Sequence, residues 1–215
     1  MLALGLFVLG FFSGSVLYSA LLPRLTKGVD VRALAPDHNP GAANVFKYAG
    51  VPVGILALVC DLAKAYVPVR LALRWLPLAD PAFALVLCAP VLGHAFSPFA
   101  HFRGGKAIAA SFGALLALLP GCTVVLPLIF WYILFSTAVI IRPHAVRTIL
   151  TFVLVAAAAA RQPFFSVRMG VVLIAAAVIW RHLPALRGQQ PALILLGHTV
   201  WTSRHGSPGE RPMRP

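Results

Sequence analysis

A polar, glycine-rich strip in the middle of the chain, residues 93–111, holds the side chains best suited to chemistry. It places His94 and Lys106 between apolar runs, where a membrane protein rarely carries basic groups without a use for them. Gly104 and Gly105 directly precede the lysine, and a helix of small residues is expected after it. Bare backbone N–H groups, the positive end of a helix and an ammonium group all favour an anion. The strip therefore predicts an intramembrane or interfacial site for a phosphate-bearing substrate.

A second polar segment, residues 29–44, follows the first apolar run. It combines acidic, basic, amide and imidazole side chains, and its sequence Asn39-Pro40-Gly41 favours a tight turn that projects backbone N–H groups. Asn44 is placed to cap the helix that is expected to follow. The segment is either a solvated loop with a turn or a binding loop, and the repeated polar residues favour binding.

Two further pairs of polar residues have helical spacing. Asp61 and Lys64 are three positions apart inside an apolar run, so they share a helix face and are expected to pair. The pair is either structural or directed at the substrate. His94 and His101 are seven apart, but no cysteine or acid at a suitable spacing completes a zinc site. Neither a metal nor a cofactor is expected.

The composition indicates a membrane protein. Of the 215 residues, 60% are hydrophobic and 11% are charged, whereas soluble domains carry about 25% charged residues. The mean hydropathy is +0.89. The net charge of +13 is spread between apolar runs instead of clustered, which favours anionic lipids and substrates over nucleic acid.

The apolar runs predict an all-α helical bundle with seven transmembrane spans. Lysine and arginine are more frequent in the connections after odd-numbered spans, which predicts an external N-terminus and a cytoplasmic C-terminus. Residues 1–190 are expected to form one transmembrane domain, 191–203 a short apolar segment at the interface or on the bundle, and 204–215 a disordered basic tail. The expected spans are Leu2–Leu22, Val51–Leu73, Pro81–His94, Ala107–Leu119, Cys122–Ile141, Thr148–Ala160 and Val167–Trp180.

Two well-known catalytic signatures are missing from the sequence. No aspartate lies five residues after any histidine, so the His-x-x-x-x-Asp acyltransferase box is missing, and no Gly-x-Ser-x-Gly nucleophile elbow is present. A transfer reaction in this chain is therefore expected to depend on positioning and electrostatics.

Several motifs together resemble the PlsY family of bacterial acyl-phosphate:glycerol-3-phosphate acyltransferases. The similarity is clearest between about residues 10 and 120. The stretches that carry it are Gly14-Ser15, Lys27–Arg32, Asn39–Phe46, Asp61–Ala65, Pro68-Val69, Gly93–Phe99 and Phe102–Lys106.

The resemblance implies a seven-helix enzyme in the bacterial cell membrane, with its active site facing the cytoplasm. Such an enzyme moves an acyl group from acyl phosphate to the 1-hydroxyl of glycerol 3-phosphate and releases lysophosphatidate. An acyl phosphate is already activated, so no covalent enzyme intermediate is needed.

On this reading, Lys106 neutralises phosphate, Gly104 and Gly105 present backbone donors, and His94 orders the site. The residues predicted to take part in catalysis are His94, Lys106, Asp37 and His38. The residues predicted to bind substrate phosphate are Arg32, Asn39, Gly41, Asn44, Lys47, Ser97, Arg103, Gly104, Gly105, Arg142 and His182.

The chain departs from the family pattern at several of these positions. The Gly-Ser-Gly-Asn segment of the family is replaced by Ala35–Asn39, which lacks the serine and contains one extra residue. Lys47 stands where the family has arginine, and so loses the bidentate fork. The serine pair expected after the fifth span is absent from 142–148. His182 is retained, whereas Ala185 replaces an asparagine.

These departures leave other functions open. A divergent paralogue that acylates another polar acceptor is one alternative. An anion transporter or binding protein is a second, although no inverted repeat supports it. A non-catalytic protein of lipid synthesis is a third.

Overall fold

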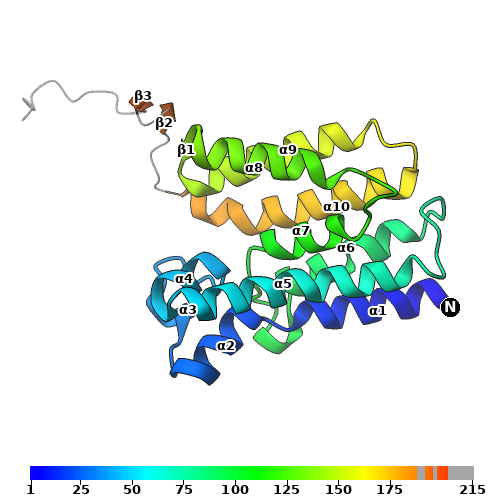
Figure 1. The fold of residues 1–215 in the computed structure, drawn as a ribbon, viewed down its shortest axis with the longest axis horizontal. Helices are drawn as coiled ribbons and strands as arrows, with labels where there is room; N and C mark the ends of the chain where they lie inside the picture. Colours follow the sequence, from blue (N-terminus) through cyan, green and yellow to red (C-terminus); the bar gives the residue numbers. More distant parts are fainter. Residues whose placement is uncertain (188–191, 196–197, 203–215) are drawn as a thin grey trace, which may run out of the picture.

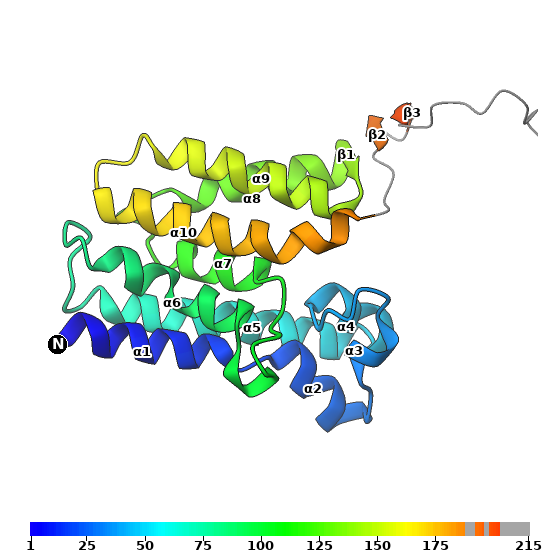
Figure 2. The same cartoon turned by 180° about the vertical axis from the view of Figure 1, so that it is seen from behind.

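The computed structural model describes residues 1–187, 192–195 and 198–202. Within these ranges the chain is mainly helical, and Figures 1 and 2 show the longer helices packed side by side as a bundle. The helices are α1 Leu2–Ser15, α2 Tyr18–Lys27, α3 Val31–Leu34, α4 Ala42–Ala49, α5 Val51–Ala72, α6 Phe83–Ala95, α7 Ile108–Leu116, α8 Val125–Thr137, α9 His144–Ala159 and α10 Phe165–His182. Short 3₁₀ turns follow α6 at Pro98–Ala100 and α10 at Leu183–Leu186.

Three helical segments of the described chain are long and apolar enough to cross a membrane. They are Val51–Ala72, Phe83–Ala100 and Phe165–Leu186, and α1 with α2 makes a fourth if this pair, bent by 40°, counts as one span. The helices α8 and α9 are apolar but shorter. The helix α7 has nine residues, well below the roughly 20 that a crossing needs. Seven spans therefore remain a prediction.

The first expected span, Leu2–Leu22, is broken instead of continuous. The helix α1 ends at Ser15, and Val16 adopts an extended conformation before α2 begins. Side chains from elsewhere bind the carbonyl groups that the break leaves free. Lys64 Nζ lies 2.5 Å from the Val16 oxygen, and Ser97 Oγ donates to the Ser15 oxygen at 2.7 Å. Unsatisfied backbone groups are costly in lipid, so these contacts stabilise the break.

Glycines allow the closest helix contacts of the bundle. A Cβ atom on Gly93 of α6 would lie 1.9 Å from the Phe11 carbonyl oxygen of α1. One on Gly14 of α1 would lie 2.0 Å from the Pro90 oxygen of α6. The helices α1 and α6 thus touch backbone to backbone, as small residues permit in membrane proteins. The main apolar core spreads from this contact to α5, α7, α9 and α10.

A small antiparallel sheet corrects one expected span. The helix α8 ends at Thr137, short of the predicted Ile141, and β1 (Val139–Arg142) follows. β1 pairs with β2 (Ala192–Leu195), and β2 with β3 (His198–Thr202). The run Val139-Ile140-Ile141 is β-branched and favours a strand once a partner is available. The apolar segment expected at 191–203 therefore contributes strands, and the predicted tail at 204–215 lies outside the described residues.

Candidate functional site

A cavity of about 680 Å³ lies where the loop before α4 meets α5, α6, α7 and the start of α9. One wall is apolar and includes Leu58, Leu62, Ile108 and Phe112. The rest of the lining is polar. Its polar side chains are those of Asp37, Asn39, Asn44, Asp61, His94, Lys106, Tyr132 and His144.

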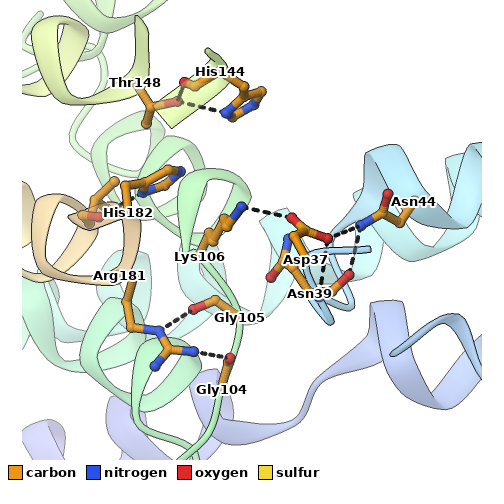
Figure 3. A network of polar contacts seen from close by, with 11 residues as sticks. Asp37, Asn39, Asn44, Gly104, Gly105, Lys106, His144, Thr148, Arg181 and His182 are labelled. Carbon is orange, nitrogen blue, oxygen red and sulfur yellow. Dashed lines mark hydrogen bonds and ion pairs between the residues drawn. The ribbon is translucent and has the colours of Figure 1, made fainter. Parts of the chain in front are cut away.

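Lys106 and Asp37 form an ion pair at this cavity, as Figure 3 shows. Lys106 Nζ lies 2.7 Å from Asp37 Oδ2. The other carboxylate oxygen, Oδ1, accepts from the Asn44 side-chain amide at 3.1 Å and from the Asn39 N–H at 3.3 Å. Burial raises the pKa of Asp37, but the contacts with Lys106, Asn39 and Asn44 outweigh it and hold the pKa below its ordinary value. Asp37 is therefore ionised at neutral pH.

The two glycines before Lys106 are held by Arg181 of α10. The Arg181 guanidinium donates to the Gly104 oxygen at 2.6 Å and to the Gly105 oxygen at 3.2 Å (Figure 3). The Gly105 N–H donates to the His94 carbonyl at 3.0 Å, so this amide is engaged within the protein and does not face a substrate. A Cβ on Gly104 would lie 1.9 Å from the His94 oxygen. The glycines thus allow the loop to lie directly on the end of α6. In this position the Lys106 side chain of the loop reaches the cavity.

His94 and Asp61 connect the cavity to the break between α1 and α2. His94 is 5% exposed, and its Nδ1 lies 3.9 Å from Asp61 Oδ1. Asp61 pairs with Lys64 at 2.7 Å, as their spacing predicted, and accepts from Ser19 Oγ at 2.5 Å. Lys64 in turn binds the Val16 carbonyl. The pair thus has a structural contact at the break, while Asp61 also lines the cavity.

Other predicted residues lie outside the cavity. Lys47 is exposed, with its ammonium 5.0 Å from the centre of the Tyr48 ring. Ser97 is buried and donates to Ser15, which is a structural contact. Arg142 is exposed on β1. We therefore find no support in the geometry for phosphate contacts by these three residues.

Arg32 lines a second cavity, of about 470 Å³, between α2 and the turn at Phe99. Its guanidinium donates to the Arg103 carbonyl at 3.0 Å, while the Arg103 side chain is exposed. Burial lowers the pKa of Arg32. His38 is also exposed, and its Nδ1 lies 3.0 Å from the Arg32 carbonyl oxygen. The two residues border the loop but do not line the larger cavity.

His182 is fully buried next to the cavity wall. Its Nδ1 lies 2.7 Å from the Val178 oxygen, and its ring stacks on that of His144 with 5.9 Å between centroids (Figure 3). His144 lines the cavity, and it was not among the predicted site residues. Its position directly after Pro143, between two apolar runs, was the only signal in the sequence, and that signal also fits a residue that anchors a span end. Within the described ranges, no three potential metal ligands gather.

The comparisons with known proteins agree with the motifs. The family model described as glycerol-3-phosphate acyltransferase matches residues 4–188. Glycerol-3-phosphate acyltransferases of Myxococcus xanthus and Desulfovibrio desulfuricans are 38% and 40% identical, over 58% and 60% of this chain. The matches span 65% and 52% of those relatives, respectively. The Pseudomonas paraeruginosa protein of the same name is 36% identical over 84% of this chain and 92% of its own length.

Solved structures show the same fold. A crystal structure of PlsY, an integral membrane glycerol 3-phosphate acyltransferase, in its glycerol 3-phosphate form has a TM-score of 0.74 and is 26% identical. The match covers 86% of this chain and 90% of that one. The lysophosphatidic acid form gives a TM-score of 0.72 at 24% identity, over 86% and 89% of the two chains. The resemblance inferred from the motifs is thus confirmed, and the chain belongs to the glycerol-3-phosphate acyltransferase family.

Proposed function

We propose that this chain transfers an acyl group from acyl phosphate to the 1-hydroxyl of glycerol 3-phosphate and releases lysophosphatidate and phosphate. The observation that carries this proposal is the two-sided cavity. Lys106, Asn39 and Asn44 supply a polar end suited to phosphate, and the wall at Ile108 and Phe112 is suited to an acyl chain. The relatives named as glycerol-3-phosphate acyltransferases support the same reaction.

The chemistry requires positioning more than a nucleophile. The acceptor hydroxyl oxygen attacks the acyl carbon, the bond to the bridging phosphate oxygen breaks, and phosphate leaves with the proton of the hydroxyl. Lys106 neutralises phosphate charge, while the side-chain amide of Asn39 orients the oxygens. Asn44, whose amide donates to Asp37 and to the Asn39 carbonyl, holds the loop in place. Alignment of two bound reactants removes much of the entropic barrier. His94, buried below Gly105, supports the loop that carries the lysine.

We further propose that residues 1–190 form one unit with seven crossings in the bacterial inner membrane. The N-terminus would lie outside, and the cavity would open to the cytoplasm. The distribution of lysine and arginine between the connections supports this orientation.

The direct test is turnover by the purified protein. Incubation with an acyl phosphate and glycerol 3-phosphate should yield lysophosphatidate, and Lys106→Ala should lower kcat/KM at least 100-fold, about 2.7 kcal/mol. Lys27→Ala, which removes an exposed lysine at the end of α2, is the matched control and should be neutral. Absence of lysophosphatidate with the wild-type chain, while a related enzyme turns over under the same conditions, would refute the proposal.

A second candidate is acylation of another polar acceptor. Asp37 favours it, because a carboxylate at the cavity changes which head groups are tolerated. A panel of polyol phosphates and uncharged polyols separates the two functions. Glycerol 3-phosphate as the sole acceptor would exclude the second one.

A further inference from the structure

The cavity contains a cation that is already neutralised by the protein. Among the cavity-lining residues of the described chain, Lys106 is the single lysine or arginine. Its Nζ atom is bound to Asp37 Oδ2 at 2.7 Å. Asp61, the other acid of the lining, has its own partner in Lys64. The ammonium best placed for substrate phosphate is therefore bound to an internal carboxylate.

A phosphate that reaches Lys106 must compete with this carboxylate. Two anions at one ammonium repel each other, and the repulsion is strong where water is partly excluded. The Asp37 side chain is 38% exposed and that of Lys106 is 17% exposed, so solvent screens the pair only in part. Binding of phosphate to Lys106 therefore costs the ion pair between Lys106 and Asp37, which weakens the affinity for phosphate.

The loop around Asp37 allows this exchange. The Oδ1 atom of Asp37 accepts from the Asn39 N–H of the same loop and from the Asn44 side-chain amide in the first turn of α4, while Oδ2 faces Lys106. The carboxylate therefore keeps local partners when the lysine is taken by another anion. Asn44 also donates to the Asn39 oxygen at 2.8 Å, which ties the loop to the first turn of α4.

We infer that Asp37 is a specificity-determining residue that acts as a resident competitor for Lys106 and sets how tightly the site binds phosphate-bearing substrates. This inference rests on the proposed function only in assigning Lys106 to phosphate. It predicts that the wild-type chain binds phosphate groups more weakly than a variant without the Asp37 charge. Loss of the carboxylate charge should improve binding without damage to the reaction.

Asp30 provides a matched control. It lies in the same connection, its side chain is 40% exposed, and it is also paired with a cation, Arg24. Neither Asp30 nor Arg24 lines the larger cavity. Asp30→Asn therefore changes the net charge as Asp37→Asn does, but it leaves Lys106 untouched.

The test is titration calorimetry of the full-length protein in detergent with two probes, inorganic phosphate and glycerol 3-phosphate. Asp37→Asn should tighten the Kd for both about threefold to tenfold, and Asp30→Asn should change it less than twofold. In a Lys106→Gln background, Asp37→Asn should have no effect, because the competition acts through the lysine. Steady-state kinetics should show a lower KM for glycerol 3-phosphate with kcat within twofold.

The possible outcomes test the inference and the proposed function separately. Unchanged or weaker binding by Asp37→Asn, with a normal thermal unfolding profile, excludes competition. A tenfold fall in kcat at constant Kd would instead make Asp37 a proton acceptor. If Asp37→Asn tightens phosphate binding but no variant turns over, the proposed function fails and the inference stands. If the wild-type chain turns over and the variant matches it in every constant, the inference alone fails. If neither probe binds any variant, both fail.

Discussion

The contact between α1 and α6 and the cavity at Lys106 both depend on glycine, but in different ways. At the helix contact, Gly14 and Gly93 let two backbones touch, with apolar side chains around them. At the cavity, Gly104 and Gly105 let a loop lie on the carbonyl and ring of His94, and charged groups surround it. At the helix contact, the space between two backbones decides which side chains are tolerated. At the cavity, the charges of the surrounding side chains decide it.

This difference predicts which property a substitution changes in each region. An extra methyl group at the helix contact meets backbone atoms, which cannot move without a shift of a whole helix. A change of charge at the cavity meets side chains and partly exposed groups, which can rearrange. Stability should therefore report on the first region and kinetics on the second.

The largest effect is expected at the helix contact. Gly93→Ala places a Cβ 1.9 Å from the Phe11 oxygen, so α1 and α6 must separate. Overpacking of this kind costs about 1–3 kcal/mol, more than the gain of up to about 1 kcal/mol from the better helix propensity of alanine. Thermal unfolding in detergent should show a lower midpoint.

Gly5→Ala is the control within α1. A Cβ at Gly5 meets no atom within 4 Å, so this variant should be neutral or slightly stabilised. Equal unfolding midpoints for Gly93→Ala and the wild type would contradict close backbone contact between α1 and α6.

A smaller effect, on kinetics, is expected at the loop. Arg181→Gln removes the charge-assisted hydrogen bonds to the Gly104 and Gly105 oxygens, which orient the segment that carries Lys106. We expect kcat/KM to fall about tenfold, equivalent to about 1.4 kcal/mol, mainly through kcat. Arg181→Lys should recover part of the loss, because lysine supplies a donor without the planar fork.

Arg168→Gln, on the same helix, tests whether the effect belongs to the loop. Arg168 lies over the Phe165 ring at 6.0 Å and has no contact with the glycines. A loss of activity equal to that of Arg181→Gln, or a loss matched by an equal loss of thermal stability, would mean that Arg181 acts only on the fold.

The sequence predicted the features that depend on short spacing. The Asp61–Lys64 pair follows from a separation of three residues on a helix. The prediction that Asn44 caps the next helix was wrong: Gly41 is the N-cap of α4, and Asn44 lies in the first turn, where its amide binds Asp37 and the Asn39 carbonyl. Lys106, which follows two glycines and was predicted to bind phosphate, lines the cavity, while its role stays a prediction. Motif similarity extended these local features to a family.

Features that depend on distant partners could not be predicted in this way. The break at Val16 is stabilised by Lys64, 48 residues away, and by Ser97 through the Ser15 carbonyl, 82 residues away. Arg181 reaches Gly104 across 77 residues, and within its own segment it looks like an ordinary basic span end. The strand at Val139 requires β2 as a partner. The pattern of apolar residues alone predicts that these residues belong to continuous transmembrane helices or to the basic ends of spans.

The smallest effect is expected at Lys47, a charge that the sequence assigned to phosphate but the structure places away from the cavity. Lys47 is exposed and its ammonium lies 5.0 Å from the centre of the Tyr48 ring, so Lys47→Gln should leave kcat/KM for glycerol 3-phosphate within twofold. Comparison with Lys106→Ala in the same assay isolates position from charge, since both substitutions remove one cation. A tenfold loss of kcat/KM for Lys47→Gln would contradict this expectation. It would show that α4 turns toward the cavity during turnover, so that charges outside the present cavity lining also act on the substrate.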